Sequence, residues 1–354
     1  MFFDRIILSI YLYFAFIGDL VSETHVTYSD WASQIIRIYP GELAAEVEWL
    51  VGPIPIDDDT GKEIISKYIT NLNSNSLFWT DSSGRETIQR QRNFRPTWDL
   101  DLQEFVAGNY YPITTDISLS DSEVGIEAAI IIDRAQGGSS LRDGELELMV
   151  HRRLLHDDAF GVGEALNETA YGQGLVARGR HWIMLGGVDD PEFLKQKQLM
   201  KQEKVLDTQV VLTDAGSLDF DTWSKSYKLE FSGLTNDLPD TVQILTLEPW
   251  KGTTYLIRLE HLIEKRQSQE PVTVNLEGLF TTFDIVDCRE TTLGANQWLD
   301  EASRLQWRKE TNEVPMNKEV PNKSTKASLE ITLNPRQIRT FICEVQPKSK
   351  SGKN

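Results

Sequence analysis

The stretch Ala128-Ala-Ile-Ile-Ile132 is apolar at every position. A strand with one exposed face alternates apolar and polar residues, so this run predicts a central strand that is covered on both faces. Other runs do alternate: Leu43 to Val51 and Tyr255 to Ile263 place apolar side chains at every second position. Turns such as Gly137-Gly138 and Asp143-Gly144 separate such runs. Many short strands with this punctuation indicate an all-β protein built from sandwiches.

The composition is acidic. The chain has 354 residues, and 36 Lys and Arg against 54 Asp and Glu give a net charge of −18. An acidic surface repels phosphate backbones, which excludes non-specific nucleic-acid binding. The length predicts two domains with a boundary in the polar residues 233–240. The expected division is residues 1–22 as a signal-like or non-homologous segment, 23–235 as a large β domain, 236–346 as a small β domain and 347–354 as a mobile basic tail.

An apolar run from Ile6 to Ile17 follows Arg5 at the start of the chain. It is too short to span a bilayer, which requires about 20 residues. Three interpretations remain open: a signal peptide with a cleavage point near Gly18 or Ser22, a buried first strand, or a start that replaces other upstream coding sequence. We expect no membrane span in any of these cases.

One helix is expected before the domain boundary. Asp190 is a capping residue, Pro191 suits the first turn, and the helix should continue to Val205. Its later half carries several lysines, which suit the negative end of the helix dipole: Lys195, Lys197, Lys201 and Lys204. Residues 296–307 are a candidate for a second short helix.

The two cysteines, Cys288 and Cys343, have two interpretations. They are either small buried apolar residues or, in a secreted chain, a disulfide that joins two strands of the second domain. Two sequons suit a secreted chain and make Asn167 and Asn322 candidate N-glycosylation sites, although such triplets also occur by chance.

Catalytic and metal-binding motifs are scarce. None of the five histidines forms the i, i+4 pair of a helical metal site, and His261 fits a structural role in a strand. The sequence contains neither a phosphate-binding glycine loop nor a nucleophile elbow. Residues 57–59, three aspartates, lack the interleaved spacing of a calcium loop and indicate a solvated turn.

Two pairs of arginines are the candidate site residues. Arg90 and Arg92 share one face of a predicted strand. Arg152 and Arg153 end another strand, in which alternation places Arg152 on the apolar side, where it needs an anionic partner such as Asp157 or Asp158. Each pair is either a structural ion-pair cluster or part of a ligand-facing cleft.

Several stretches, taken in order, resemble the C-terminal half of the lysosomal-type α-mannosidases of glycoside hydrolase family 38. The resemblance covers about residues 24–346. The stretches are Glu48 to Pro55, Gly61 to Glu63, Trp79 to Glu86, Phe94 to Trp98, Val106 to Pro112, Gly137 to Gly144, Leu148 to Leu154, Phe231 to Leu234, Arg289 to Leu293, Ala295 to Gln297 and Ile338 to Phe341.

The resemblance implies a large galactose-mutarotase-like β super-sandwich followed by a smaller β-sandwich. It implies retaining hydrolysis of terminal α-mannosides of N-linked glycans, in the lysosome or after secretion. In this family the nucleophile and the zinc ligands belong to an N-terminal catalytic domain, so no residue here is assigned to either role. That domain and a mannose-containing oligosaccharide are the expected partners.

The resemblance further implies that an arginine of this half reaches the substrate. We place it at Arg90 or Arg92, with Arg152 and Arg153 as alternatives. The competing function is a catalytically inactive, secreted carbohydrate-binding or structural module.

Overall fold

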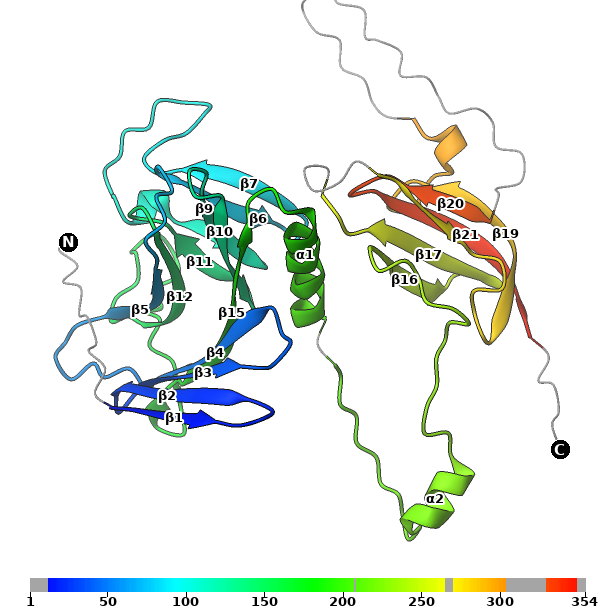
Figure 1. Ribbon diagram of the computed structural model, residues 1–354, viewed down its shortest axis with the longest axis horizontal. Coiled ribbons are helices and arrows are strands. Elements are labelled where there is room, and N and C mark those ends of the chain that lie inside the picture. Colours follow the sequence, from blue (N-terminus) through cyan, green and yellow to red (C-terminus); the bar gives the residue numbers. More distant parts are fainter. Residues whose placement is uncertain (1–11, 207, 265–269, 304–328, 349–354) are drawn as a thin grey trace, which may run out of the picture. The chain divides into compact units, whose positions relative to one another are not determined.

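The computed structural model describes residues 12–206, 208–264, 270–303 and 329–348. Strands dominate these residues, and the prediction of an all-β fold is confirmed. The chain divides into two compact units, Met1–Asp207 and Thr208–Asn354 (Figure 1). This division precedes the expected boundary at residues 233–240. The residues between the two positions contain one short helix, α2 (Phe220–Ser226), which the sequence analysis missed.

The first unit is built from two antiparallel sheets. The larger sheet has nine strands in the order β1-β2-β3-β4-β15-β10-β9-β6-β7, and the smaller has four in the order β5-β12-β11-β8. The strands of the larger sheet are β1 (Leu12–Ile17), β2 (Ser22–Ser29), β3 (Ala32–Ile38), β4 (Ala44–Val51), β6 (Leu77–Ser82), β7 (Glu86–Gln91), β9 (Asp116–Asp121), β10 (Ile126–Ile132) and β15 (Ala177–Gly187). Those of the smaller sheet are β5 (Lys62–Ile69), β8 (Tyr111–Ile113), β11 (Gln136–Ser139) and β12 (Glu145–Arg153), and a short hairpin pairs β13 (Thr169–Ala170) with β14 (Gln173–Gly174).

β10 carries the uniformly apolar run and lies between β15 and β9, inside the larger sheet. Ile130 and Ile132 belong to a buried cluster with Leu148 of β12, so this face packs against the smaller sheet. Ile131 belongs to another buried cluster with Phe193 of the helix α1 (Pro191–Val205). The prediction of a central strand that is covered on both faces is therefore confirmed.

Helix α1 begins where the sequence predicts. Asp190 caps it by accepting a hydrogen bond from the backbone N–H of Glu192. Its buried residues follow helical spacing along one face, yet half of them are polar: Phe193, Leu194, Lys197, Gln198, Met200 and Lys201. The face that meets the sheet therefore has no apolar stripe.

Two lysines of α1 form buried ion pairs with the sheet, whereas the sequence analysis expected them to interact with the negative end of the helix dipole. The ammonium group of Lys197 contacts the Glu127 carboxylate of β10, and that of Lys201 lies 2.7 Å from the Asp116 carboxylate of β9. None of the four side chains is more than 7% exposed. Each buried cation thus neutralises a carboxylate on the sheet face that α1 covers.

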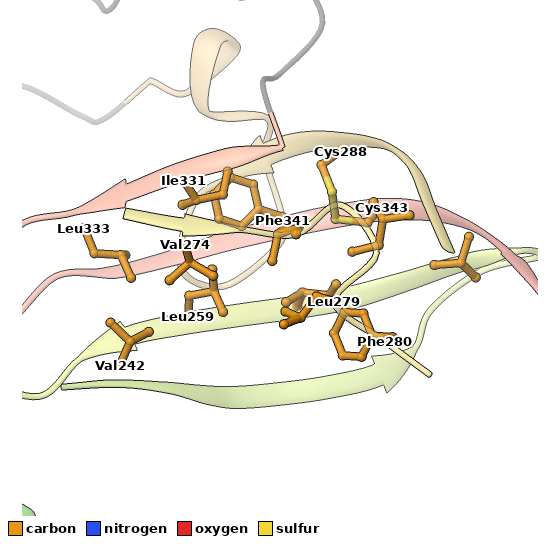
Figure 2. Packing of buried hydrophobic residues seen from close by; sticks show 14 residues of the cluster. Val242, Leu259, Val274, Leu279, Phe280, Cys288, Ile331, Leu333, Phe341 and Cys343 are labelled. Atoms are coloured by element: carbon orange, nitrogen blue, oxygen red, sulfur yellow. A yellow bond between two sulfur atoms is a disulfide. The ribbon is translucent and has the colours of Figure 1, made fainter. Parts of the chain in front are cut away.

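The second unit is a smaller sandwich. Its main sheet has the order β16-β17-β21-β19, and β18 pairs with β20. The strands are β16 (Val242–Pro249), β17 (Thr254–His261), β18 (Val272–Asn275), β19 (Phe283–Thr291), β20 (Glu330–Leu333) and β21 (Ile338–Pro347). One apolar cluster, shown in Figure 2, contains residues from all of these strands. Leu259 and Phe341 are among its almost fully buried members.

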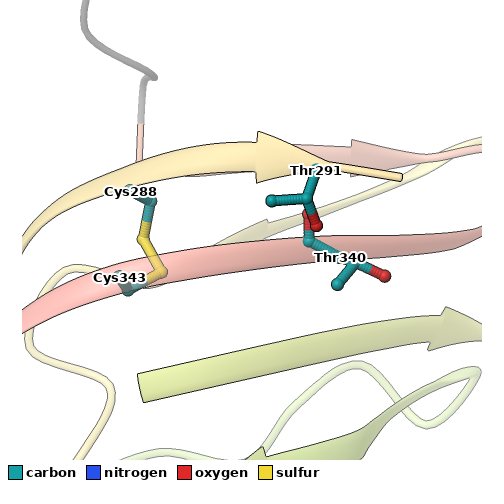
Figure 3. The surroundings of a disulfide bond; sticks show 4 residues. All are labelled: Cys288, Thr291, Thr340 and Cys343. Carbon is teal, nitrogen blue, oxygen red and sulfur yellow. A yellow bond between two sulfur atoms is a disulfide. The ribbon is translucent and has the colours of Figure 1, made fainter. Parts of the chain in front are cut away.

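Cys288 of β19 and Cys343 of β21 lie opposite each other in the strand register and form a disulfide. Figure 3 shows the bond crossing between the two strands. Both residues are buried members of the apolar cluster, so the bond crosslinks the core of the second unit.

Two expected segments differ from the structure. Of the segment 296–307, the structure shows a single 3-10 turn at Leu299–Glu301, and residues from 304 onward lie outside the described part. At the start of the chain, β1 pairs with β2, but its side chains from Tyr13 to Ile17 are exposed, Phe14 by 55%. The interpretation as a buried first strand is therefore wrong, because β1 forms the edge of the sheet.

Candidate functional site

Arg90 lies near the end of β7 and stacks on Tyr111. Its guanidinium carbon is 4.3 Å from the centre of the tyrosine ring, and the guanidinium of Arg95 lies 5.1 Å from the same centre. The Nε of Arg90 donates a hydrogen bond of 3.0 Å to the hydroxyl of Thr80. Tyr111 packs edge-on against buried Phe78. This cluster therefore presents two cations on an aromatic ring that is anchored in the core.

Arg92 has a structural partner. Its guanidinium lies 2.7 Å from the Asp143 carboxylate, in the turn before β12. Burial opposes ionisation of Asp143, but the backbone N–H of Ser76 and the side chains of Arg92 and Ser74 hydrogen-bond the carboxylate and hold its pKa below the usual value. Arg92 therefore ties β7 to the smaller sheet, although it shares a predicted face with Arg90.

A third polar group adjoins this region, and the sequence analysis did not predict its contacts. Tyr110 precedes Tyr111 and donates a hydrogen bond of 2.6 Å to the Glu147 carboxylate of β12. Lys67 of β5 pairs with Glu145 at 2.8 Å and lies 3.6 Å from Glu147. Alternation places Glu145 and Glu147 on one face, but burial of Glu147 to 2% exposure depends on Lys67 and Tyr110, which are distant in sequence.

Arg152 does not point to the apolar side of its strand. The register of β12 against β5 shifts between Met149 and His151, and this irregularity interrupts the alternation. The Arg152 side chain is 51% exposed, and its guanidinium lies 3.4 Å from Glu63 of the neighbouring strand. The expected partners Asp157 and Asp158 instead hydrogen-bond backbone N–H groups of their own loop.

Arg153 is held by two oxygen atoms. Its Nε donates to the side-chain oxygen of Asn167 at 2.6 Å, and one terminal nitrogen donates to the Ile54 carbonyl at 2.9 Å. A shallow pocket lies beside it, lined by His151, Arg152, Arg153, Leu166, Glu168 and Leu175. Of the two candidate glycosylation sites, Asn167 is exposed, whereas Asn322 lies outside the described residues.

The structure does not bring the two arginine pairs together. Arg92 contacts the turn before β12, whereas Arg152 lies near the last residue of that strand. The seven residue steps from Glu145 to Arg152 span about 20 Å at the usual strand rise. One monosaccharide cannot contact both pairs, so the candidates define two separate regions of the first unit.

Among the histidines, His181 is a buried structural residue. His181 is buried between the two sheets, where its ring nitrogens hydrogen-bond the Tyr68 hydroxyl and the Gln136 side chain at 2.8 and 2.9 Å. Burial lowers the pKa of His181 to about 4.

Within the described ranges, no three His, Cys, Asp or Glu side chains form a group that could hold a metal ion, so this part of the chain does not fit a zinc ion.

Comparison with known families accounts for both units. Residues 16–160 match the glycosyl hydrolases family 38 C-terminal domain. Residues 241–341 match the glycosyl hydrolases family 38 C-terminal beta sandwich domain. The chain belongs to glycosyl hydrolase family 38. The family's two C-terminal domains thus correspond to the larger and the smaller sandwich.

Family 38 relatives extend well beyond this chain. Lysosomal alpha-mannosidase of Bos taurus is 47% identical over 93% of the chain, and that of Homo sapiens is 45% identical over 94%. The chain covers only 32% of each of these relatives. It therefore spans about a third of the length of the curated relatives it matches.

A solved structure supports the fold alone. The alpha-mannosidase of Enterococcus faecalis V583 superposes with a TM-score of 0.53 at 12% identity, over 91% of this chain and 29% of that one. The described helices include none that is both long enough and apolar enough to cross a membrane.

Proposed function

We propose that this chain is the β-sandwich portion of a lysosomal-type α-mannosidase that removes terminal α-mannose from N-linked glycans. The nucleophile and the zinc ligands would come from the part of the protein that corresponds to the remaining length of the relatives. The chain itself would support that catalytic part and contribute one arginine to the sugar-binding cleft. We further propose a lysosomal or secreted location.

The identity to lysosomal α-mannosidases carries this proposal. It extends over 93% of the chain, and thus across both sandwiches. Identity of 47% over such a length is far above the level at which only a fold is shared.

Exposed apolar side chains lie beside the Arg90 cluster. The loop between β7 and β8 exposes Phe94, Trp98 and Phe105 by 46 to 59%. Arg95 fixes this loop by donating to the backbone carbonyls of Phe94 and Gly108. Large exposed apolar side chains on an anchored loop are typical of a contact surface. We assign it to the catalytic part of the same enzyme.

Arg90 is the best candidate for the cleft. The guanidinium groups of Arg92 and Arg153 are already engaged by the side chains of Asp143 and Asn167. Arg152 belongs to the other region and lies beside a sequon. Arg90 is held in orientation by Thr80 and Tyr111, and it adjoins the exposed loop. A planar guanidinium held in this way suits bidentate hydrogen bonding to sugar hydroxyl groups.

A chimera tests the proposal. The matching third of the bovine lysosomal enzyme is replaced by this chain, and hydrolysis of a chromogenic α-mannoside is measured at acid pH with zinc present. We expect an active chimera and an inactive isolated chain. Arg90→Met should lower kcat/KM by about 10- to 100-fold, as for loss of one charge-assisted hydrogen bond.

Arg178→Met is the matched control. Arg178 is exposed on β15, and three strands separate β15 from β7, so this substitution should leave activity unchanged. Turnover by the isolated chain would refute the proposed division of labour. An active chimera in which Arg90→Met has no effect would refute the role of Arg90 alone.

Trp98 supports the alternative of a carbohydrate-binding module, because its 59% exposed ring could stack on a sugar. In that case the isolated chain binds mannose oligosaccharides, and Trp98→Ala abolishes the binding. The enzyme proposal predicts no measurable binding by the isolated chain in calorimetry.

A further inference from the structure

Asn167 lies at the end of a loop that Arg153 fastens to the sandwich. The Arg153 guanidinium donates to Asn167 at 2.6 Å and to the Ile54 carbonyl at 2.9 Å. Asn167 is nevertheless exposed, as are its neighbours Glu168 and Thr169. The residue is thus fixed in orientation and accessible at the same time.

The contact with Arg153 distinguishes the oxygen from the nitrogen of the Asn167 side-chain amide. A guanidinium group only donates hydrogen bonds, so the amide atom that faces Arg153 is the oxygen Oδ1. The other atom, Nδ2, is therefore directed away from Arg153. This nitrogen is the atom that N-glycosylation modifies.

Arg153 also lies beside the hairpin that contains Thr169, the hydroxyl end of the Asn167-Glu168-Thr169 sequon. Thr169 pairs with Gly174 in the β13–β14 hairpin. Gly174 is buried against Arg153, and a Cβ atom at this position would lie 2.6 Å from the guanidinium. Tyr171 and Gly172 form the tip, both with positive φ, as a two-residue hairpin turn requires. The guanidinium that bonds Asn167 thus also lies beside Gly174, the residue that pairs with Thr169.

We infer that Asn167 is an N-glycosylation site and that Arg153 is its positioning residue. The inference rests on the secretory location in the proposed function. The donor is a polyprenyl-diphosphate-linked oligosaccharide. Nδ2 bonds to its anomeric carbon, the bond from that carbon to the diphosphate oxygen breaks with its electron pair going to the diphosphate, and Nδ2 loses one proton. Oδ1 is unchanged, so its bond to Arg153 persists and orients the first sugar.

The proposed glycosylation site adjoins the neighbouring pocket. Leu166 and Glu168, which flank Asn167, both line the pocket together with His151 and Arg152. A glycan on Asn167 would therefore stand at the rim of this pocket, between two of its lining residues.

The test uses the full chain secreted from mammalian cells behind a supplied signal peptide, with peptide mass mapping before and after glycosidase treatment. We expect a glycan on the peptide that contains Asn167. Asn167→Gln and Thr169→Ala should remove it, Thr169→Ser should retain it, and Ser324→Ala should leave it unaffected. Arg153→Met should retain the glycan but let the glycosidase release it several-fold faster from the folded protein.

An unmodified Asn167 in the secreted chain overturns the site. Equal release rates in the parent chain and Arg153→Met overturn the role of Arg153. The supplied signal peptide makes these outcomes independent of the enzyme assay. A glycosylated chain in an inactive chimera refutes the enzyme proposal alone, and an unmodified chain in an active chimera refutes only this inference.

Discussion

In the first unit, two buried ion pairs connect a helix to a sheet, whereas in the second unit a disulfide crosslinks a continuous apolar cluster. The first unit divides its buried apolar residues among three clusters, and polar contacts such as Lys197 with Glu127 and His181 with Tyr68 lie between its layers. The second unit joins all its strands through one cluster that includes both cysteines. The first unit therefore depends on specific pairs, and the second on apolar area and a covalent constraint.

The largest expected effect is on the ion pair beneath α1. Lys197→Met should lower the free energy of unfolding of the first unit by about 3–5 kcal/mol, because the Glu127 carboxylate stays buried without its cation. Native-state hydrogen exchange of α1 and β10 peptides in increasing denaturant measures this loss unit by unit. Peptides of β17, in the second unit, should be unchanged.

The double variant Lys197→Met/Glu127→Met is the matched control for this prediction. Replacing both charges with apolar groups of similar volume should recover most of the stability, since neither leaves a buried charge. Equal losses in the single and double variants would show that packing, rather than the charge pair, holds α1 on the sheet.

The second unit should respond most to loss of its disulfide. The Cys288–Cys343 bond spans 55 residues along the chain. Cys288→Ala/Cys343→Ala should lower the stability of this unit by about 2–4 kcal/mol, because the unfolded chain gains conformational freedom. Exchange of β17 and β21 peptides should accelerate, while exchange of β10 remains unchanged. Equal acceleration of hydrogen exchange in both units would contradict the independent stability of the two units.

The sequence predicts the apolar parts of this architecture better than the polar ones. The run Ala128 to Ile132 predicts a strand covered on both faces, because side chains on each of its faces belong to a buried apolar cluster. Asp190 and Pro191 predict where α1 begins, because capping is local. The burial of Lys197 could not be predicted, because its partner Glu127 is 70 residues away in the sequence.

The candidate site shows the same limit. Arg90 lies on β7 and Arg92 directly after it, but only the fold shows that one meets Tyr111 and the other Asp143. For Arg152 the alternation itself misleads, since the irregularity after Met149 turns the side chain toward Glu63. Such irregularities depend on the partner strand and leave no mark in the strand's own sequence.

The smallest expected effect is the pH dependence of stability that arises from the buried histidines. Each unit contains one of them, so the two units should respond independently. Burial holds the pKa of His181 at about 4, and the nearby Asp133 and Arg134 act on it in opposite directions. The folded state therefore binds this proton only near pH 4, whereas an unfolded histidine binds it below about pH 6.5. The stability contribution is thus present above pH 6.5 and falls by about 2 kcal/mol between pH 7 and pH 5.

Substituting each histidine separates the two pH profiles. His181→Gln should flatten the fall in stability of the first unit without changing the second. Burial also lowers the pKa of His261, so His261→Gln should flatten only the profile of the second unit. Hydrogen exchange of β15 and β17 peptides at pH 5 and pH 7, corrected for intrinsic rates, measures both. A parent chain whose first unit is equally stable at the two pH values would show that protonation of buried His181 is compensated elsewhere in the fold.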